Sequence, residues 1–126
     1  MARSRDLEPI PFDEPPALGG TKTAPNPVEQ LLGALGSCLI IGYAGNAGVA
    51  GIELKDLRIE LEDDLDRQTF LGLADGNAGF SAIRARVLIE SDANDEAVEA
   101  LHRKVVSTSP VGHTLSRSIP VGVDLV

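Results

Sequence analysis

The stretch "NPVEQLLGALGSCLIIGYAGNAG", residues 26–48, decides the fold of this chain. Asn26 suits the N-cap of a helix, Pro27 suits its first position, and Glu29 completes a reciprocal capping box. Apolar residues then recur at helical spacing, namely Val28, Leu31, Leu32, Leu35 and Leu39. The pattern predicts one long helix that begins at residue 27 and ends in the glycine-rich run "GNAGVAG", residues 45–51.

This helix carries no charged residue from Leu31 to Ile52, a length that could cross a bilayer. Its glycines and Asn46 dilute the hydrophobicity, however. We therefore expect a buried central helix and not a membrane span.

The remaining segments predict an α+β fold. Residues 54–64 and 80–91 alternate between apolar and charged side chains, which predicts two paired strands with an acidic outer face opposite a basic one. Residues 92–107 predict an amphipathic helix, Ser109 and Pro110 begin a short helix, and residues 118–126 predict a closing strand. We expect one domain, residues 1–126, in which an extended segment (residues 1–25) precedes a long helix packed on an antiparallel-rich sheet.

Composition narrows the function. The formal net charge is −8, and the chain has one Tyr, three Phe and no Trp, which argues against a nucleic-acid partner and against a membrane surface. A single cysteine excludes an internal disulfide, and the N-terminal stretch lacks the apolar core of a signal peptide, so we expect a cytoplasmic protein. His102 and His113 are too few to form a typical zinc site with one cysteine, so we expect no metal.

Two stretches together resemble the OsmC/Ohr family of thiol-dependent hydroperoxide reductases: "DEPPALGGTKTAPNPVEQLLGALGSCL", residues 13–39, and "SPVGHTLSRSIPVGVDLV", residues 109–126. The resemblance implies an intertwined homodimer with the long helices at its centre. It also implies that Cys38 is the attacking thiol, while Ser109 occupies the position of the family's resolving cysteine.

Two departures from the family pattern favour the broader OsmC-like branch over Ohr itself. Val28 follows Pro27 where Ohr-type members place a glutamate, and the acid is Glu29, about 100° further around the helix. The segment before the helix is also shorter than is usual in the family, and Arg3 and Arg5 are the only arginines there to pair with the thiol.

Peroxide reduction needs a thiolate, and the sulfenic acid that forms must be removed by a second thiol. Because Ser109 cannot form a disulfide, the resemblance implies an external thiol or dithiol reductant and no bound cofactor. Activation of Cys38 would come from an arginine, from His113 or from the start of the short helix at Ser109. The apolar neighbours Leu35, Leu39 and Tyr43 favour an apolar hydroperoxide as the substrate.

Three hypotheses remain open from the sequence. The first is a one-cysteine peroxidase that acts on organic or hydrogen peroxide, and the second is a dimer that binds a small apolar ligand without turnover. The third is a structural domain whose Cys38 only packs in the core. Plainer explanations also exist for the supporting residues: Glu29 and Ser109 as helix caps, and His113 as a surface residue.

Overall fold

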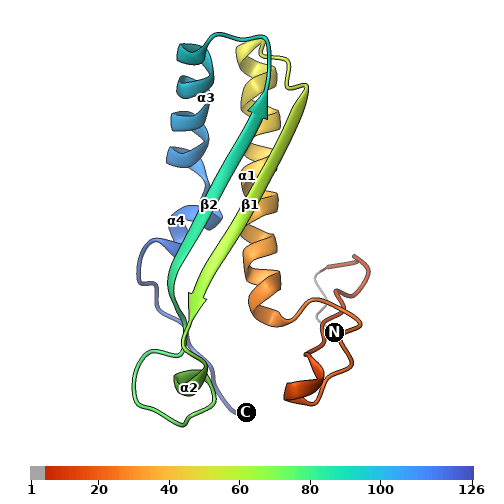
Figure 1. Cartoon of the computed structure of the whole chain (residues 1–126), viewed down its shortest axis with the longest axis vertical. Helices are drawn as coiled ribbons and strands as arrows, with labels where there is room; N and C mark the ends of the chain where they lie inside the picture. Colours follow the sequence, from red (N-terminus) through yellow and green to blue (C-terminus); the bar gives the residue numbers. More distant parts are fainter. Residues whose placement is uncertain (1–4) are drawn as a thin grey trace. The chain divides into compact units, whose positions relative to one another are not determined.

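The structure is a computed structural model that describes residues 5–126 (Figure 1). Its elements are η1, α1, β1, α2, β2, α3 and α4 in chain order. The chain divides into two compact units, Met1–Leu35 and Gly36–Val126, and helix α1 has residues in both. The single domain expected over residues 1–126 stays a prediction.

One carboxylate organises the loop of the first unit. Asp13 Oδ2 accepts hydrogen bonds from the backbone N–H groups of Thr21 and Thr23, each at 3.0 Å, and also from both threonine hydroxyls. These hydrogen bonds, that from the Thr21 hydroxyl first, hold the pKa of Asp13 below its usual value. The short 3-10 helix η1, Pro16–Leu18, lies within this loop. The segment expected to be extended therefore folds into a hydrogen-bonded loop from Asp13 onward.

Helix α1, Pro27–Ala50, is the long helix that the sequence predicts. Glu29 N–H donates to Asn26 Oδ1 at 2.8 Å, and Asn26 N–H donates to Glu29 Oε2 at 2.9 Å, which is the predicted capping box. The helix ends before Gly51, whose φ of +69° is the left-handed conformation of a C-terminal cap. Both predicted ends of this helix are confirmed.

Helix α1 also meets the length and composition of a membrane-spanning helix. Its most apolar 18-residue window has a mean hydropathy of 1.4, and 28% of that window is buried within the chain. Core helices of soluble proteins meet the same criteria, so this property is weak evidence for a membrane span. It does mean that most of the helix surface is not covered by the part of the chain that the structure describes.

Strands β1, Asp56–Leu65, and β2, Phe80–Glu90, form an antiparallel hairpin, as predicted. Glu60 lies opposite Arg86, and Glu62 lies opposite Arg84. Arg84 also pairs with Asp64 at 2.7 Å, and its guanidinium holds the pKa of the Asp64 carboxyl below the usual value. These arginines thus belong to an exposed face of paired charges. The short helix α2, Arg67–Phe70, lies in the connection between the two strands.

Helix α3, Asp95–Thr108, begins where the Asn94 side chain accepts a hydrogen bond from the Ala97 N–H group. Helix α4, Pro110–Leu115, follows directly, as predicted. The buried apolar side chains of the second unit come from α1 and α3, namely Leu39, Tyr43, Ala47, Leu101 and Val105. A Cβ atom on Gly42 would lie 3.0 Å from Val105 Cγ1, so these two helices approach closely at that glycine.

The predicted closing strand is wrong for the isolated chain. Residues 117–126 form no strand, and Val123 and Leu125 are 91% and 102% exposed. A strand needs a neighbour to share its backbone hydrogen bonds, and Pro120 has no N–H group to donate. Over residues 5–126 the sheet contains β1 and β2 alone, so the terminal segment has no strand partner within the described chain.

Candidate active site around Cys38

The second unit brings Cys38 and Ser109 together, although they lie 71 positions apart in the sequence. Cys38 is on α1, and Ser109 is at the junction of α3 and α4. The distance from Cys38 Sγ to Ser109 Oγ is 3.4 Å, within hydrogen-bond range for sulfur. The cysteine is half-buried and carries a free thiol. The two positions that the resemblance relates to the family's pair of cysteines are therefore in contact here as a thiol and a hydroxyl.

Ser109 lies at the turn between α3 and α4, and its role as a cap of both helices fixes its position. Its backbone is extended, with φ −71° and ψ 113°, so it both ends α3 and caps α4. Its hydroxyl accepts a hydrogen bond from the Gly112 N–H group at 3.0 Å, and the residue is only 5% exposed. Because that hydroxyl already accepts one hydrogen bond, its proton is free to point toward sulfur. A thiolate has no proton, so in that state Ser109 is the donor and Cys38 Sγ the acceptor.

Close approaches on either side of Cys38 fix its part of α1. A Cβ atom on Gly36 would lie 2.9 Å from Leu61 Cδ1 of β1, and Gly42 meets Val105 of α3. Larger residues at these two positions would push α1 away from its neighbours. The glycines thus set the distance at which the Cys38 thiol meets the Ser109 hydroxyl.

The other predicted site residues are placed differently. Glu29 belongs to the first unit, where its carboxylate accepts from the Asn26 N–H group as a helix cap. His113 lies exposed on α4, where its backbone N–H donates to the Ser109 carbonyl oxygen at 2.9 Å. Arg5 belongs to the first unit, and Arg3 lies outside the described residues. Among the described residues, the Cys38 side chain makes its hydrogen bond with Ser109.

The apolar neighbours expected to favour an apolar substrate are core residues. Leu35 and Leu39 are each 8% exposed, and Tyr43 is 0% exposed. They contribute to the packing of α1. Their role in substrate choice stays a prediction.

Sequence reasoning missed a second polar pair. The Tyr43 hydroxyl lies 2.5 Å from His102 Nδ1, and the two rings stack with their centroids 6.2 Å apart. Burial raises the pKa of the Tyr43 phenol above its usual value of 10.0. The signal in the sequence was the position of His102, one helical turn after Val98 and next to the buried Leu101.

Metal-binding side chains are dispersed. In the residues that the structure describes, 5–126, no three His, Cys, Asp or Glu side chains form a group that could hold a metal ion. The chemistry available at Cys38 is that of a thiol beside a hydroxyl donor.

A helix-borne thiol, packed against an antiparallel hairpin and a capped helical turn, defines an α+β protein with a candidate redox cysteine. The chain belongs to the OsmC-like protein family, whose sequence model matches residues 19–124. This match includes both Cys38 and Ser109.

Known proteins similar to this chain support the same fold. YmaD, an uncharacterized protein of Bacillus subtilis (strain 168), is 30% identical over 113 residues, which cover 88% of this chain and 71% of YmaD. The crystal structure of an OsmC-like protein from Mycoplasma pneumoniae matches with a TM-score of 0.68 and 18% identity, over 82% of this chain and 68% of that one. An organic hydroperoxide resistance protein OsmC from Legionella pneumophila matches with a TM-score of 0.63 and 24% identity, over 86% and 74%.

Proposed function

We propose that this protein is a one-cysteine, thiol-dependent peroxidase that reduces organic hydroperoxides or hydrogen peroxide in defence against oxidative stress. The single observation that carries the proposal is the 3.4 Å contact between Cys38 Sγ and Ser109 Oγ. Family membership supports it, because the Legionella relative of this fold is an organic hydroperoxide resistance protein.

The reaction begins with attack of the Cys38 thiolate on the terminal peroxide oxygen. A sulfur–oxygen bond forms, the O–O bond breaks, and the departing alkoxide takes up a proton to become an alcohol. The sulfur is oxidised by two electrons to a sulfenic acid while the peroxide is reduced. Ser109 acts before this step, when its O–H group donates to the thiolate and stabilises the charge that the attack uses.

The second half of the reaction needs thiols from outside the chain. A small thiol or dithiol condenses with the sulfenic acid, which releases water and forms a mixed disulfide. A second thiol then reduces this disulfide, and the Cys38 thiol is restored. Ser109 cannot take the place of the first thiol, and no cofactor is required.

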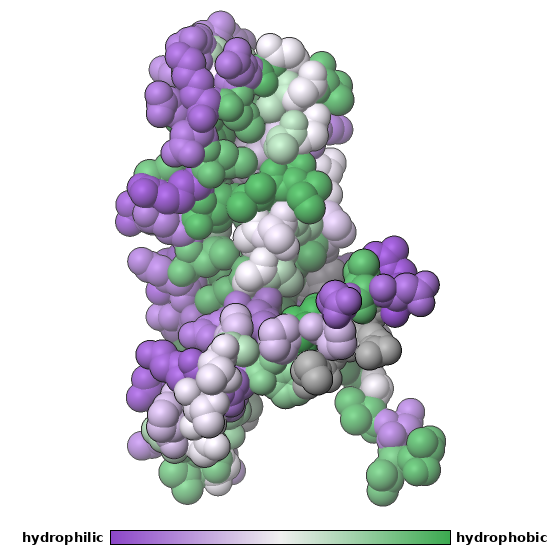
Figure 2. Space-filling model, turned by 90° about the vertical axis from the view of Figure 1, so that its right-hand side faces the viewer, coloured by the Kyte–Doolittle hydropathy of each residue, from purple (hydrophilic) through white to green (hydrophobic). Residues whose placement is uncertain are grey.

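We propose a cytoplasmic homodimer as the working form. Apolar side chains are widespread on the face drawn in Figure 2, and on α1 Ile40, Ile41 and Val49 are 43%, 73% and 91% exposed. Small residues accompany them, and a Cβ atom on Gly45 or Gly48 would meet no atom within 4 Å. Such a surface suits a second copy of α1, since small side chains allow two helices to approach closely.

The alternative function is a dimer that binds a small ligand and has no peroxidase turnover. It is favoured by the state of Ser109, which is buried and already used as the cap of α4. A hydroxyl in that position cannot resolve a sulfenic acid within the chain.

Trapping of the sulfenic acid tests the two functions. The native protein is treated with stoichiometric cumene hydroperoxide in the presence of dimedone, and labelling is followed by mass spectrometry. Rapid labelling at Cys38 that a dithiol prevents, and that is absent in Cys38→Ser, supports the peroxidase. Persistence of the free thiol under these conditions rules it out and leaves the ligand-binding dimer.

A matched pair of serine variants tests the role of the hydroxyl. Ser109→Ala should slow labelling at least about tenfold, since a hydrogen bond to a charged group is worth roughly 1.5–3 kcal/mol. Ser107→Ala is the control, because the Ser107 hydroxyl is exposed and donates to the Lys104 carbonyl oxygen at 3.0 Å. Equal labelling rates in the two variants would remove Ser109 from the mechanism.

A further inference from the structure

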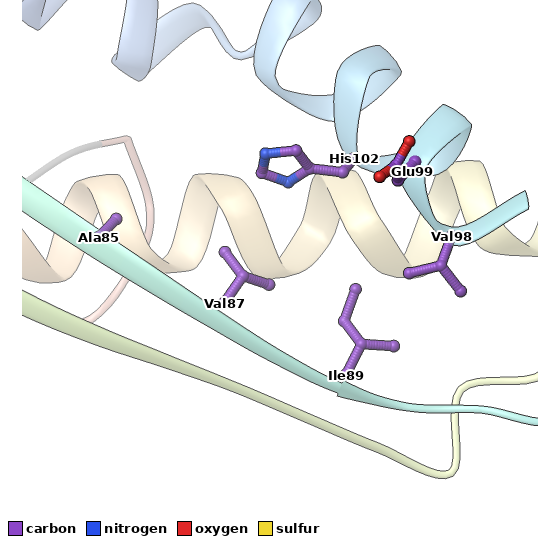
Figure 3. Close-up of a pocket in the computed structure, with 6 residues that line it drawn as sticks. All are labelled: Ala85, Val87, Ile89, Val98, Glu99 and His102. Carbon is purple, nitrogen blue, oxygen red and sulfur yellow. The ribbon is translucent and has the colours of Figure 1, made fainter. Parts of the chain in front are cut away.

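A groove lies between β2 and α3, separate from the Cys38–Ser109 contact. It has a volume of about 330 Å³ and is lined by Ala85, Val87, Ile89, Val98, Glu99 and His102. Figure 3 shows Ala85, Val87 and Ile89 on the face of β2 that is turned toward α3, and Val98, Glu99 and His102 on α3 opposite them. The volume is within the range of roughly 300–1,000 Å³ that small-molecule sites occupy.

The His102 ring at this groove is held in place by a hydrogen bond with Tyr43 of α1. Tyr43 is completely buried, so its phenol must place its proton on an acceptor, and the acceptor within reach is His102 Nδ1. With Nδ1 accepting, the neutral His102 ring carries its proton on Nε2. The exposed edge of the ring is therefore a hydrogen-bond donor held in one orientation by a buried partner.

Glu99 gives the groove a negative charge. It lies three residues before His102 on α3, and Figure 3 shows the His102 ring pointing away from its carboxylate. Its ion-pair partner is Arg103 at 3.5 Å, an exposed pair of little strength. A carboxylate in this position disfavours an anionic ligand.

From this arrangement we propose that the groove binds a small, uncharged, apolar molecule with one oxygen that accepts a hydrogen bond. The body of the ligand packs on Val87, Ile89 and Val98, while its oxygen accepts from His102 Nε2. An alcohol satisfies this donor without placing a charge near Glu99, which a carboxylate or a hydrocarbon cannot do. The inference does not depend on the reactivity of Cys38.

The test uses the two histidines as an internal comparison. The chain contains only His102 and His113, and His113 lies exposed on α4. The full-length Cys38→Ser variant, which has no thiol, is titrated with 2-phenyl-2-propanol while the ring resonances of both histidines are followed by NMR. The His102 resonances should move and saturate with a dissociation constant in the millimolar range, as about ten ligand heavy atoms at roughly 0.3 kcal/mol each imply. The His113 resonances should not move.

Two variants make the result specific to the groove. Ala85→Phe fills the groove from an exposed position of β2 and should abolish the saturable shift. Glu96→Phe, which adds the same side chain at an exposed position of α3 outside the groove lining, is the matched control and should bind normally.

Three outcomes would overturn the proposal. One is the absence of a saturable His102 shift up to the solubility limit of the probe. Another is a parallel shift of both histidines, which indicates a solvent effect. The third is a His102 resonance that responds to protein dilution and not to the probe, which indicates that a second copy of the chain covers the groove.

Discussion

Helix α1 makes two polar contacts with the segment after β2, and they are built in opposite ways. In the first, the α1 atom is the half-buried Cys38 sulfur and its partner, Ser109, is 5% exposed. In the second, the α1 residue is the fully buried Tyr43, and its partner, His102, is exposed. In the first contact the half-buried nucleophile Cys38 lies against a buried hydrogen-bond donor, Ser109. In the second contact the Tyr43 phenol is buried and the His102 imidazole is exposed to solvent.

The largest effect is expected from a substitution that converts the Cys38–Ser109 contact into a covalent bond. Ser109→Cys places a thiol where the hydroxyl now lies 3.4 Å from Cys38 Sγ. After one equivalent of cumene hydroperoxide, the introduced thiol should attack the Cys38 sulfenic acid and form a disulfide with loss of water. Dimedone labelling should fall at least tenfold, because the disulfide forms within the chain and the trapping reagent must arrive from solution.

Intact mass before and after reduction gives the readout for this variant. The expected species is two hydrogens lighter than the dithiol and returns to it with dithiothreitol. Undiminished dimedone labelling in Ser109→Cys would show that the two positions do not come together in solution. That result would leave Tyr43–His102 as the one of these two polar contacts that forms in solution.

A change at Gly42 should disturb both contacts together. Gly42→Ala places a Cβ atom 3.0 Å from Val105 Cγ1, and overpacking of this kind lowers the free energy of unfolding by about 1–3 kcal/mol. Alanine regains up to about 1 kcal/mol of helix propensity, so a net loss of about 1 kcal/mol is expected. Urea unfolding in the Val105→Ala background is the control, and there Gly42→Ala should be neutral or stabilising. Equal effects in both backgrounds would show that this approach does not limit the helix spacing.

Much of this arrangement follows from the sequence. The capping box at Asn26 and Glu29, the end of α1 at Gly51, the pairing of two charged strands and the Ser109 cap depend on neighbouring residues or on a simple period. Local patterns of this kind are readable without a structure. The resemblance to the OsmC/Ohr family then related Cys38 to Ser109, which no local pattern could do.

What the sequence did not predict depends on contacts between distant segments. The Tyr43–His102 pair joins positions 59 apart, and nothing near either residue specifies the other. The prediction of a strand at residues 118–126 was wrong for a related reason. The alternation of side chains is typical of a strand, but a strand also needs the edge of a neighbouring strand for its backbone hydrogen bonds. Pattern alone thus gives the elements and leaves open which of their side chains meet.

Substitutions at the two residues of the second contact should have unequal effects on the free energy of unfolding, because Tyr43 is buried and His102 is exposed. His102→Ala leaves the Tyr43 hydroxyl without an acceptor and should lower the free energy of unfolding by about 2 kcal/mol. Tyr43→Phe removes the hydroxyl itself and leaves the exposed His102 to bond with water, so a loss of about 1 kcal/mol is expected. Urea unfolding of both variants measures the difference. A larger loss in Tyr43→Phe than in His102→Ala would contradict the assignment of the phenol as the desolvated group.

The smallest effect is the titration of Tyr43, which the sequence makes easy to observe because it is the only tyrosine and there is no tryptophan. Burial raises the pKa of this phenol above its usual value of 10.0, so the native state holds the proton where the unfolded chain releases it. Stability from this group is therefore complete below about pH 10 and declines as the pH rises through the unfolded value toward the folded one. Tyrosinate absorbance near 295 nm should appear later in the folded protein than in urea. If the two titration curves coincide, the Tyr43 hydroxyl is open to water, and the contrast between the two contacts of α1 is lost.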